Sequence, residues 1–490
     1  MTLMTPFLSR HLVVIVAVVA AVSGCGARRL PADAPVGSPA ARPLHYQANN
    51  RNVDLLFLVD DSSSMRLSQD NLLRNFPVLM TTLRDLPGGL PNVHIAVISS
   101  DMGAGDGSIA SCDDQGGKNG IFQYQPQGNC LSSGLDPGAT FISDIDGVRN
   151  YSGNLEDVFT CIAALGEQGC GFEHQFAAIT RALGVDGHGA APIENQPFLR
   201  PDAYLAIVLI TDEDDCSAAP GFKFYDTANN MNMASQLGPP ANFRCNEFGH
   251  LCNGAPPNRN APNLDTNATA AYDGCTSNET GHYLLGVRDT ADRLRSLKAD
   301  DGQIMIAAIT GPRTPYVVGW KQPSTQDTSC NANGQSCPWP MIQHSCTAAD
   351  GNFADPAVRI GELAEQFGEN GRVLSICETD YSPALADIAG SVVAYVNEPC
   401  ITGRIATKPG TTHLDCTVTD NATGATIPGC ADTGGTGQCW SIRQSVTSAC
   451  AGVSLAVQPD PNGTDPAPLG TTVDCTLCAP GASDPARGCP

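Results

Sequence analysis

Val53-Asp54-Leu55-Leu56-Phe57-Leu58-Val59 is followed directly by Asp60-Asp61-Ser62-Ser63-Ser64-Met65. The almost continuous apolar run is typical of a strand buried on both faces of a parallel sheet. The polar turn after it places carboxylates and hydroxyls at the carboxyl end of that strand, just before a helical pattern begins. This stretch therefore predicts both the central strand of the fold and a polar site at its end.

The pattern on either side of this strand alternates between buried strands and amphipathic helices. Further strands are expected at 93–98, 203–210, 304–309 and 372–376, and helices at 71–86, 155–165, 172–183, 283–297, 357–367 and 381–395. Strand alternating with helix implies a parallel sheet covered on both faces by right-handed crossovers. Residues 51–398 are therefore predicted to form a doubly wound α/β domain with a mainly parallel sheet.

Three long insertions, 101–153, 216–281 and 311–355, each follow a predicted strand. They should emerge at the carboxyl edge of the sheet, where folds of this class bind ligands. Loops of this length are usually functional. They are rich in cysteines that could pin them: Cys112, Cys130, Cys216, Cys245, Cys252, Cys275, Cys330, Cys337 and Cys346.

The composition restricts the class of protein. The chain has 490 residues, 27 Lys+Arg against 50 Asp+Glu and a net charge of −23, which argues against a nucleic-acid partner. Its 21 cysteines indicate an oxidising compartment. Eight of them lie after residue 399, so residues 399–490 are predicted to form a small module stapled by disulfides.

The N-terminus indicates export. The apolar run Leu12 to Val22 is too short to span a membrane and suits a signal peptide over residues 1–24. Val22-Ser23-Gly24-Cys25 resembles a bacterial lipobox, so Cys25 is the expected lipidation site, followed by a Pro- and Ala-rich tether to residue 50. Gly26 favours the outer membrane, facing the periplasm or the cell surface. The alternative is an ordinary signal peptide with a cysteine near its cleavage site.

The polar turn has the pattern D-x-S-x-S, formed by Asp60, Ser62 and Ser64, and a later strand ends in Thr211-Asp212. Oxygen-only ligands suit a hard divalent cation, Mg²⁺ or Ca²⁺. The simpler alternative is that the serines cap the next helix. Capping needs one hydroxyl and accounts for neither aspartate, so we favour a metal site.

These residues resemble a von Willebrand factor type A domain with a metal-ion-dependent adhesion site. The resemblance covers about 51–398 and implies that Ser62 and Ser64 bind the metal directly, whereas Asp60 and Asp212 act through water. It also implies a threonine from a third loop and an acidic residue from the partner protein. More narrowly, three segments are similar to exported lipoproteins of myxobacteria-like bacteria: Arg200-Pro201-Asp202-Ala203, residues 211–216 and Cys170-Gly171-Phe172-Glu173.

The expected threonine is missing from the loop 166–174, where Glu173 is the nearest oxygen donor. Further acidic residues are expected to form a rim around the site: Asp61, Glu213, Asp214 and Asp215. Such a concentration of negative charge would discourage an acidic partner. Glu173 therefore points elsewhere, or the site is satisfied internally, with Ca²⁺ favoured, or further cations bind.

Three functions remain open at this point. The first is an envelope lipoprotein that binds a protein or glycan ligand through a metal-stabilised domain and its insertions. The second is a structural lipoprotein whose metal only stabilises the fold. The third, a hydrolase with its site in the insertions, is disfavoured because the sequence has neither G-x-S-x-G nor H-E-x-x-H. We therefore expect no enzymatic activity.

Overall fold

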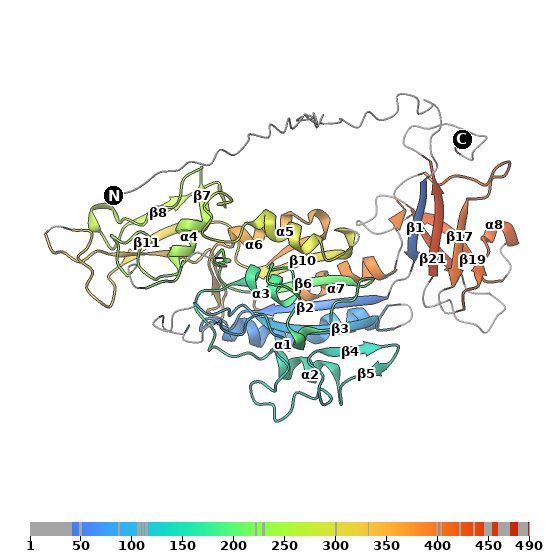
Figure 1. The fold of residues 1–490 in the computed structure, drawn as a ribbon, viewed down its shortest axis with the longest axis horizontal. Coiled ribbons are helices and arrows are strands. Elements are labelled where there is room, and N and C mark those ends of the chain that lie inside the picture. The colour runs from blue at the N-terminus through green and yellow to red at the C-terminus, as the bar shows by residue number, and fades with distance from the viewer. Residues whose placement is uncertain are drawn as a thin grey trace, which may run out of the picture.

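A seven-stranded sheet forms the centre of the computed structural model (Figure 1). The structure describes residues 42–48, 51–86, 89–104, 109, 112, 116–220, 223–227, 231–298, 301–331, 333–397, 400–401, 404–420, 423–434, 437–444, 453–458, 471–478 and 489. The strand order is β15-β10-β6-β2-β3-β4-β5. Five strands are parallel: β2 (Asn52–Val59), β3 (Asn92–Ser99), β6 (Tyr204–Ile210), β10 (Ile304–Thr310) and β15 (Gly371–Ser375). The first insertion adds an antiparallel edge, β4 (Ile142–Ile145) and β5 (Val148–Arg149).

The position of β2 fixes where a ligand site belongs in this sheet. The chain passes from β2 to β3 on one side and then returns to β6 on the other side. The strand order therefore reverses between β2 and β6. In open α/β sheets, ligands bind beyond the carboxyl ends of the strands at such a switch point.

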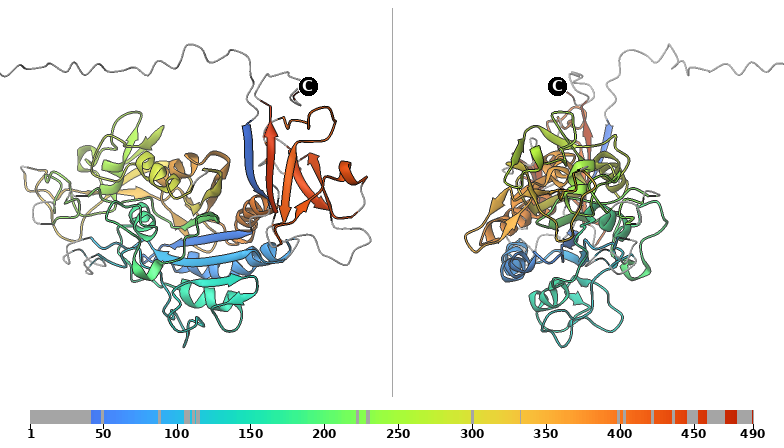
Figure 2. Two further views of the ribbon diagram at one scale, coloured as in Figure 1. Left: turned by 45° about the vertical axis from the view of Figure 1, so that its right-hand side comes forward. Right: turned by 90° about the vertical axis from the view of Figure 1, so that its left-hand side faces the viewer.

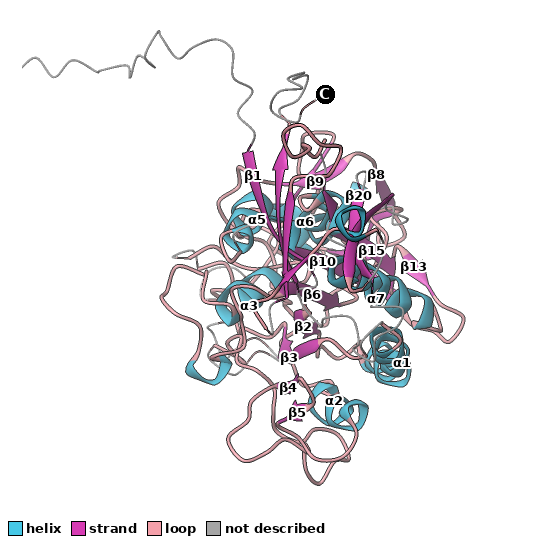
Figure 3. Cartoon of the chain, turned by 90° about the vertical axis from the view of Figure 1, so that its right-hand side faces the viewer, coloured by secondary structure: helices cyan, strands magenta, loops and turns pink. Residues whose placement is uncertain are grey.

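Helices cover both faces of the sheet (Figure 3). One face carries α1 (Arg66–Arg84), α2 (Leu155–Ala163) and α7 (Ser382–Asn397), and the other carries α3 (Gln175–Ala182), α5 (Val287–Arg295) and α6 (Val358–Glu365). Alternate residues of β2 enter the two cores, with Phe57 on the α1 face and Leu56 and Leu58 on the α3 face. The predicted α/β class is confirmed, since every predicted strand and helix overlaps an observed one.

The single charge within β2 is neutralised by distant residues. Asp54 is fully buried and accepts hydrogen bonds from the Arg200 backbone N–H (2.9 Å) and side-chain Nε (2.8 Å). Lys298 lies 3.8 Å from the same carboxylate. A buried carboxylate is tolerated only with such partners, which explains how a charged residue can occupy a central strand.

The second and third insertions fold into small elements beyond the carboxyl edge, at one end of the molecule, whereas the first insertion lies along the β3 side of the sheet, where β4 pairs with Val93–Ile95 (Figures 1 and 2). The second and third insertions form α4 (Phe243–Gly249), β7 (His250–Cys252), β8 (Thr269–Tyr272), β9 (Cys275–Ser277), β11 (Tyr316–Lys321), β12 (Trp339–Gln343), β13 (Cys346–Thr347) and β14 (Phe353–Ala354). Disulfides pin them as expected: Cys112–Cys170, Cys130–Cys161, Cys216–Cys245, Cys252–Cys275, Cys330–Cys337 and Cys346–Cys377.

The cysteine-rich module lies at the opposite end of the molecule (Figure 1). It contains β16 (Cys400–Ile401), β17 (Cys416–Asp420), β18 (Thr426–Ile427), α8 (Cys430–Thr433), β19 (Cys439–Gln444), β20 (Val453–Gln458) and β21 (Thr471–Leu477). The described disulfides here are Cys416–Cys475, Cys430–Cys439 and Cys478–Cys489.

One element corrects the predicted tether. Within residues 25–50, the segment Arg42–Ala48 is a strand, β1, paired antiparallel with β21. Its backbone is therefore held by hydrogen bonds of the module's sheet, which composition alone did not indicate. The predicted signal peptide and Cys25 lie outside the described residues. Within the described part of the chain, none of the helices has the length and apolar character needed to cross a membrane.

Candidate functional site

The D-x-S-x-S turn begins where β2 ends and is bound to the end of β6. The Asp60 backbone N–H donates to the Ile210 carbonyl (3.0 Å). The Asp60 carboxylate accepts from the Ser62 backbone N–H (2.8 Å) and from the Thr211 hydroxyl (2.7 Å). The Ser62 and Ser64 hydroxyl oxygens lie 3.2 Å apart. The turn is thus fixed with both hydroxyls on the same side.

Asp212 contributes a carboxylate without a partner. Its side chain is buried, and neither carboxylate oxygen accepts a hydrogen bond within the described structure. Burial, with Asp60 nearby, raises the pKa of Asp212 well above its ordinary value, and the nearby Ser64 hydroxyl opposes that shift. An isolated buried carboxylate is strongly unfavourable unless it is protonated or neutralised.

Glu173, just before α3, is brought to the same region. It is buried, and its Oε1 has no hydrogen-bond partner within the described structure. Burial, followed by the nearby Glu213 and Asp60, raises the pKa of Glu173 well above its ordinary value. Glu173 is therefore a buried carboxylate whose free oxygen would be satisfied by a proton or by a cation.

These groups fit a hard divalent cation. Asp60, Ser62, Ser64, Asp212 and Glu173 offer oxygen donors only, and two of the carboxylates have unpartnered oxygens that a positive charge would satisfy. In the described residues, no three side chains of the histidine, cysteine, aspartate and glutamate types form a metal-binding group by themselves. Asp60, Asp212 and Glu173 are therefore not gathered into one metal-binding group within the described residues.

A glutamine that the sequence analysis missed connects the turn to the loop 166–174. The Gln69 side-chain amide donates to the backbone carbonyls of Asp60 and Gly166, both at 2.8 Å, and its oxygen accepts from the Gly166 N–H (3.0 Å). Farther along this loop, the Gly169 N–H donates to the Asp61 carbonyl (2.7 Å). This docking places the loop that carries Glu173.

The predicted acidic rim is wrong for Asp61, which is fully buried. Its carboxylate accepts a hydrogen bond from the Ser99 hydroxyl (2.6 Å) and pairs with the Lys118 ammonium group. Lys118 comes from the first insertion, so its charge could not be assigned to the site from the sequence. Asp61 therefore adds no exposed negative charge.

Asp214 and Asp215 are also buried rather than exposed on a rim. Asp214 accepts from His250 Nε2 (2.8 Å) and from the Arg359 backbone N–H (2.8 Å). Asp215 accepts from the Arg359 guanidinium (3.1 Å) and from the Ser217 hydroxyl (2.6 Å). Both carboxylates are parts of a hydrogen-bonded ion-pair network beneath the site.

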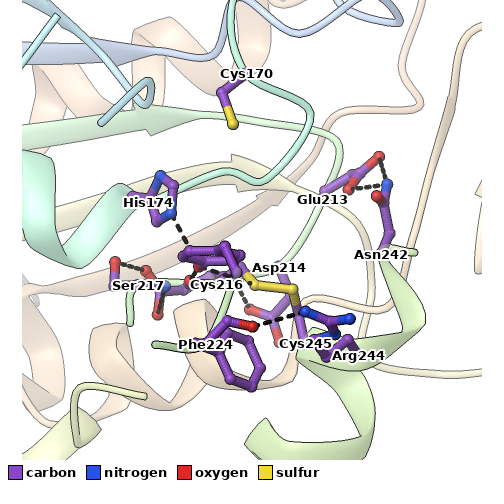
Figure 4. The surroundings of a disulfide bond; sticks show 12 residues. Cys170, His174, Glu213, Asp214, Cys216, Ser217, Phe224, Asn242, Arg244 and Cys245 are labelled. Carbon is purple, nitrogen blue, oxygen red and sulfur yellow. Dashed lines mark hydrogen bonds between the residues drawn. A yellow bond between two sulfur atoms is a disulfide. The ribbon is translucent and has the colours of Figure 1, made fainter. Parts of the chain in front are cut away.

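Glu213 is the member of the predicted rim that remains partly exposed. Both of its carboxylate oxygens accept from the Asn242 amide, at 2.9 and 2.8 Å (Figure 4). Burial, followed by Asp355, raises the pKa of Glu213 well above its ordinary value. Asp355, at the end of the third insertion, is a further carboxylate of the site that the sequence analysis missed.

Asp355 is tied to the strand end as well as to the third insertion. Its backbone N–H donates to the Asp212 carbonyl (2.8 Å), and its carboxylate pairs with His344 Nδ1 (2.8 Å). Burial raises the pKa of Asp355, while the His344 contact opposes that shift. No periodic pattern marks this position in the sequence.

Access to the metal-binding residues is narrow. Asp60, Ser62, Asp212 and Glu173 are all at most 3% exposed, whereas Ser64 is half-buried. A large partner could not place its own side chains around a cation here without moving the turn. The surrounding insertions present the accessible surface at this edge.

Comparison with known proteins gives limited information. No family model and no curated protein matches the chain. Solved structures similar to it include proximal thread matrix protein 1 from the mussel byssus (10% identity over 74% of this chain, TM-score 0.28) and a von Willebrand factor type A protein from Catenulispora acidiphila (11%, 91%, 0.28). The pilus adhesin SpaC from Lactobacillus rhamnosus GG is another (12%, 88%, 0.26).

The chain covers 52%, 63% and 40% of those three structures, respectively. Because the identities and TM-scores are low, the fold assignment rests on the strand order and helix placement described above.

Proposed function

We propose that this chain is an exported bacterial envelope lipoprotein, anchored through Cys25 to the outer membrane, that binds a protein or glycan ligand through its insertions. The observation that carries the proposal is the pair of unpartnered, buried Asp212 oxygens at the edge from which three disulfide-pinned insertions emerge. Such an arrangement makes the placement of the insertions depend on the charge state of the site. The proposed activity is binding, without catalysis and without a nucleic-acid partner.

The cation, Mg²⁺ or Ca²⁺, would be held by Asp60, Ser62, Ser64, Asp212 and Glu173. When bound, it would supply the positive charge that these carboxylates lack. The protein's own residues then join three segments, namely the ends of β2 and β6 and the loop 166–174. Because these side chains are buried, ligand contacts are proposed to come from the insertions rather than from the metal.

A second candidate function is a structural lipoprotein that assembles into an envelope complex, with a purely stabilising cation. The burial of the site is as compatible with this candidate as with a binding protein whose ligand contacts the insertions and not the metal. The two differ in whether the isolated protein binds a ligand at all.

The test measures thermal melting and ligand binding on the same purified protein, with calcium and with a chelator. The ligand probes are a printed glycan array and protein-coated surfaces. Binding that is lost with the chelator, together with a lower melting temperature, supports the binding protein. A lower melting temperature without any binding supports the structural alternative. The metal would be removed from the proposal if the chelator left the melting temperature of the wild type unchanged and if the Ser62→Ala/Ser64→Ala variant melted at that same temperature.

A further inference from the structure

The sequence contains five Asn-x-Ser/Thr tripeptides in which x is not proline, the acceptor pattern for a sugar attached to the asparagine amide. They begin at Asn150, Asn267, Asn278, Asn421 and Asn462. Such tripeptides often arise by chance, so the pattern alone selects none of them. An acceptor must also present its amide nitrogen at the surface of an exported protein. The first three tripeptides lie within the described residues, where the structure tests that condition.

Asn150 does not meet the condition. Its amide nitrogen donates to the Phe141 carbonyl (2.9 Å), and its amide oxygen accepts from the Ser143 backbone N–H (2.8 Å). These contacts join the residue after β5 to the beginning of β4. The half-buried Asn150 amide is therefore committed to closing this hairpin on both its donor and its acceptor side.

Asn278 does not meet the condition either. Its amide nitrogen donates to the Phe248 carbonyl (3.1 Å), and its amide oxygen accepts from the Thr280 hydroxyl (3.0 Å). The two groups that define the acceptor pattern, namely the amide and the hydroxyl two residues later, are thus both used by contacts within the chain. Like Asn150, this asparagine is half-buried.

Asn267 differs from both. Asn267 and Thr269 are exposed, and the asparagine lies in the turn that leads into β8. Its backbone N–H (2.8 Å) and its amide nitrogen (3.3 Å) donate to one carboxylate oxygen of the exposed Asp265. Water can replace such a surface hydrogen bond at little cost. The acidic residue two positions before the asparagine also distinguishes this tripeptide, because Val148 and Thr276 occupy that position in the other two.

We propose that Asn267 is the acceptor of an N-linked sugar in the folded, exported protein. The donor is an activated sugar whose C1 atom is bonded through oxygen to a diphosphate, and a transferase brings it to the turn. A bond forms between the amide nitrogen and C1, the C1–O bond breaks, and the diphosphate leaves with the bonding electrons. The nitrogen gives one of its two protons to a base of the transferase and keeps the other.

The position of Asn267 gives the sugar a physical effect. β8 belongs to the second insertion, at the end of the molecule opposite the cysteine-rich module (Figure 1), and is the outer strand of a three-stranded sheet beside β11. Outer strands can pair with another chain through their backbone groups. A bulky, solvated sugar next to the first residue of β8 would shield that edge.

The proposal depends on export, which the proposed function also requires, but on neither the lipid, the cation nor the ligand. Disulfides such as Cys252–Cys275, which closes a loop containing this turn, favour an oxidising compartment.

The test uses the full chain recovered from the envelope fraction of its own cells, so that a missing sugar cannot be assigned to failed export. Peptides from a protease digest are fragmented by electron transfer, which leaves a sugar on its residue. The peptide containing Asn267 is expected to carry the added mass of one or more sugars. The peptides containing Asn150 and Asn278 are matched controls in the same chain and should carry none. One sugar indicates a nucleotide-linked donor, and several indicate a lipid-linked donor.

Thr269→Ala should abolish the added mass, whereas Thr269→Ser, which keeps the hydroxyl, should retain it. Asn267→Gln, in the turn outside the strand, should also abolish it, and its melting temperature shows that the loss is not due to unfolding. The proposal would be overturned by an unmodified Asn267 in the wild type, by added mass that survives Thr269→Ala, or by equal modification of Asn150 or Asn278. Each of these results would leave the binding function untouched, because that function is tested by the chelator and ligand measurements above.

Discussion

Replacing Asp60 by asparagine is expected to stabilise the metal-free protein, although it removes a predicted metal ligand. Asp60 is fully buried, and burial, with Asp61 nearby, raises its pKa from an ordinary 3.8 to about 6 despite hydrogen bonds from Ser62 and Thr211. Each pKa unit corresponds to 1.36 kcal/mol, so ionising Asp60 in the folded, metal-free protein costs about 3 kcal/mol more than ionising it in the unfolded chain. Asparagine keeps an oxygen for the Ser62 N–H and has no charge to lose.

The sign follows from proton linkage. Because the pKa of Asp60 is higher in the folded protein than in the unfolded chain, the unfolded chain releases its proton first as the pH rises. The contribution of Asp60 to the free energy of unfolding therefore falls between about pH 4 and pH 6 and is then constant. Asp212, Glu173 and Glu213, whose pKa values are also raised, add to this decline.

The assay is urea unfolding in a chelator at several pH values from 4.5 to 7.5, repeated with calcium. Above pH 6, the Asp60→Asn variant is expected to be about 3 kcal/mol more stable than the wild type in chelator. In calcium the order should reverse, because only the wild type gains binding energy. If the variant is equally stable or less stable in chelator, with an unchanged pH dependence, the argument from an uncompensated buried carboxylate is refuted.

Three further predictions concern the rest of the molecule. Gly169→Ala should lower the free energy of unfolding by roughly 1–3 kcal/mol, because the added Cβ would lie 2.2 Å from a carboxylate oxygen of the buried Asp61. Gly171→Ala is the control: nothing lies within 4 Å of its added Cβ, so the melting temperature should change little. Arg359→Met should lower the free energy of unfolding, measured in urea, by about 3–5 kcal/mol, because it leaves the buried Asp215 without its ion-pair partner. Arg313→Met breaks the more exposed pair with Glu365 and should lower it by less than about 1 kcal/mol. Cys25→Ser should move the protein from the membrane fraction to the soluble fraction and abolish labelling by a fatty-acid probe; unchanged fractionation would contradict the lipid anchor.

The sheet could be predicted from the sequence because its central strands are buried on both faces. That requirement leaves runs such as 53–59 and 304–309 almost wholly apolar, so their positions are visible without any tertiary information. The meeting of Asp60 with Asp212 followed from the same logic, since parallel neighbouring strands bring their carboxyl ends to one edge.

The partners of the acidic residues could not be predicted in this way. Lys118 and Asp355 come from insertions with no periodic pattern, and their positions depend on how disulfides fold those segments. Asp214 and Asp215 were expected on the surface, because charged residues are rarely buried. They are buried because Arg359, from α6 far along the chain, reaches them. When the positive partner of a buried carboxylate lies so far away along the chain, the sequence around the carboxylate does not reveal the pair.

The pairing of β1 with β21 has a consequence for how the chain is made. In a chain synthesised from its N-terminus, Arg42–Ala48 emerges long before its partner Thr471–Leu477. During that interval the backbone donors and acceptors of the early strand have no native neighbour, and they are free to attach to another copy of the same strand. Completion of this sheet is thus a late event of maturation, and chains truncated before the final strand should be prone to aggregate.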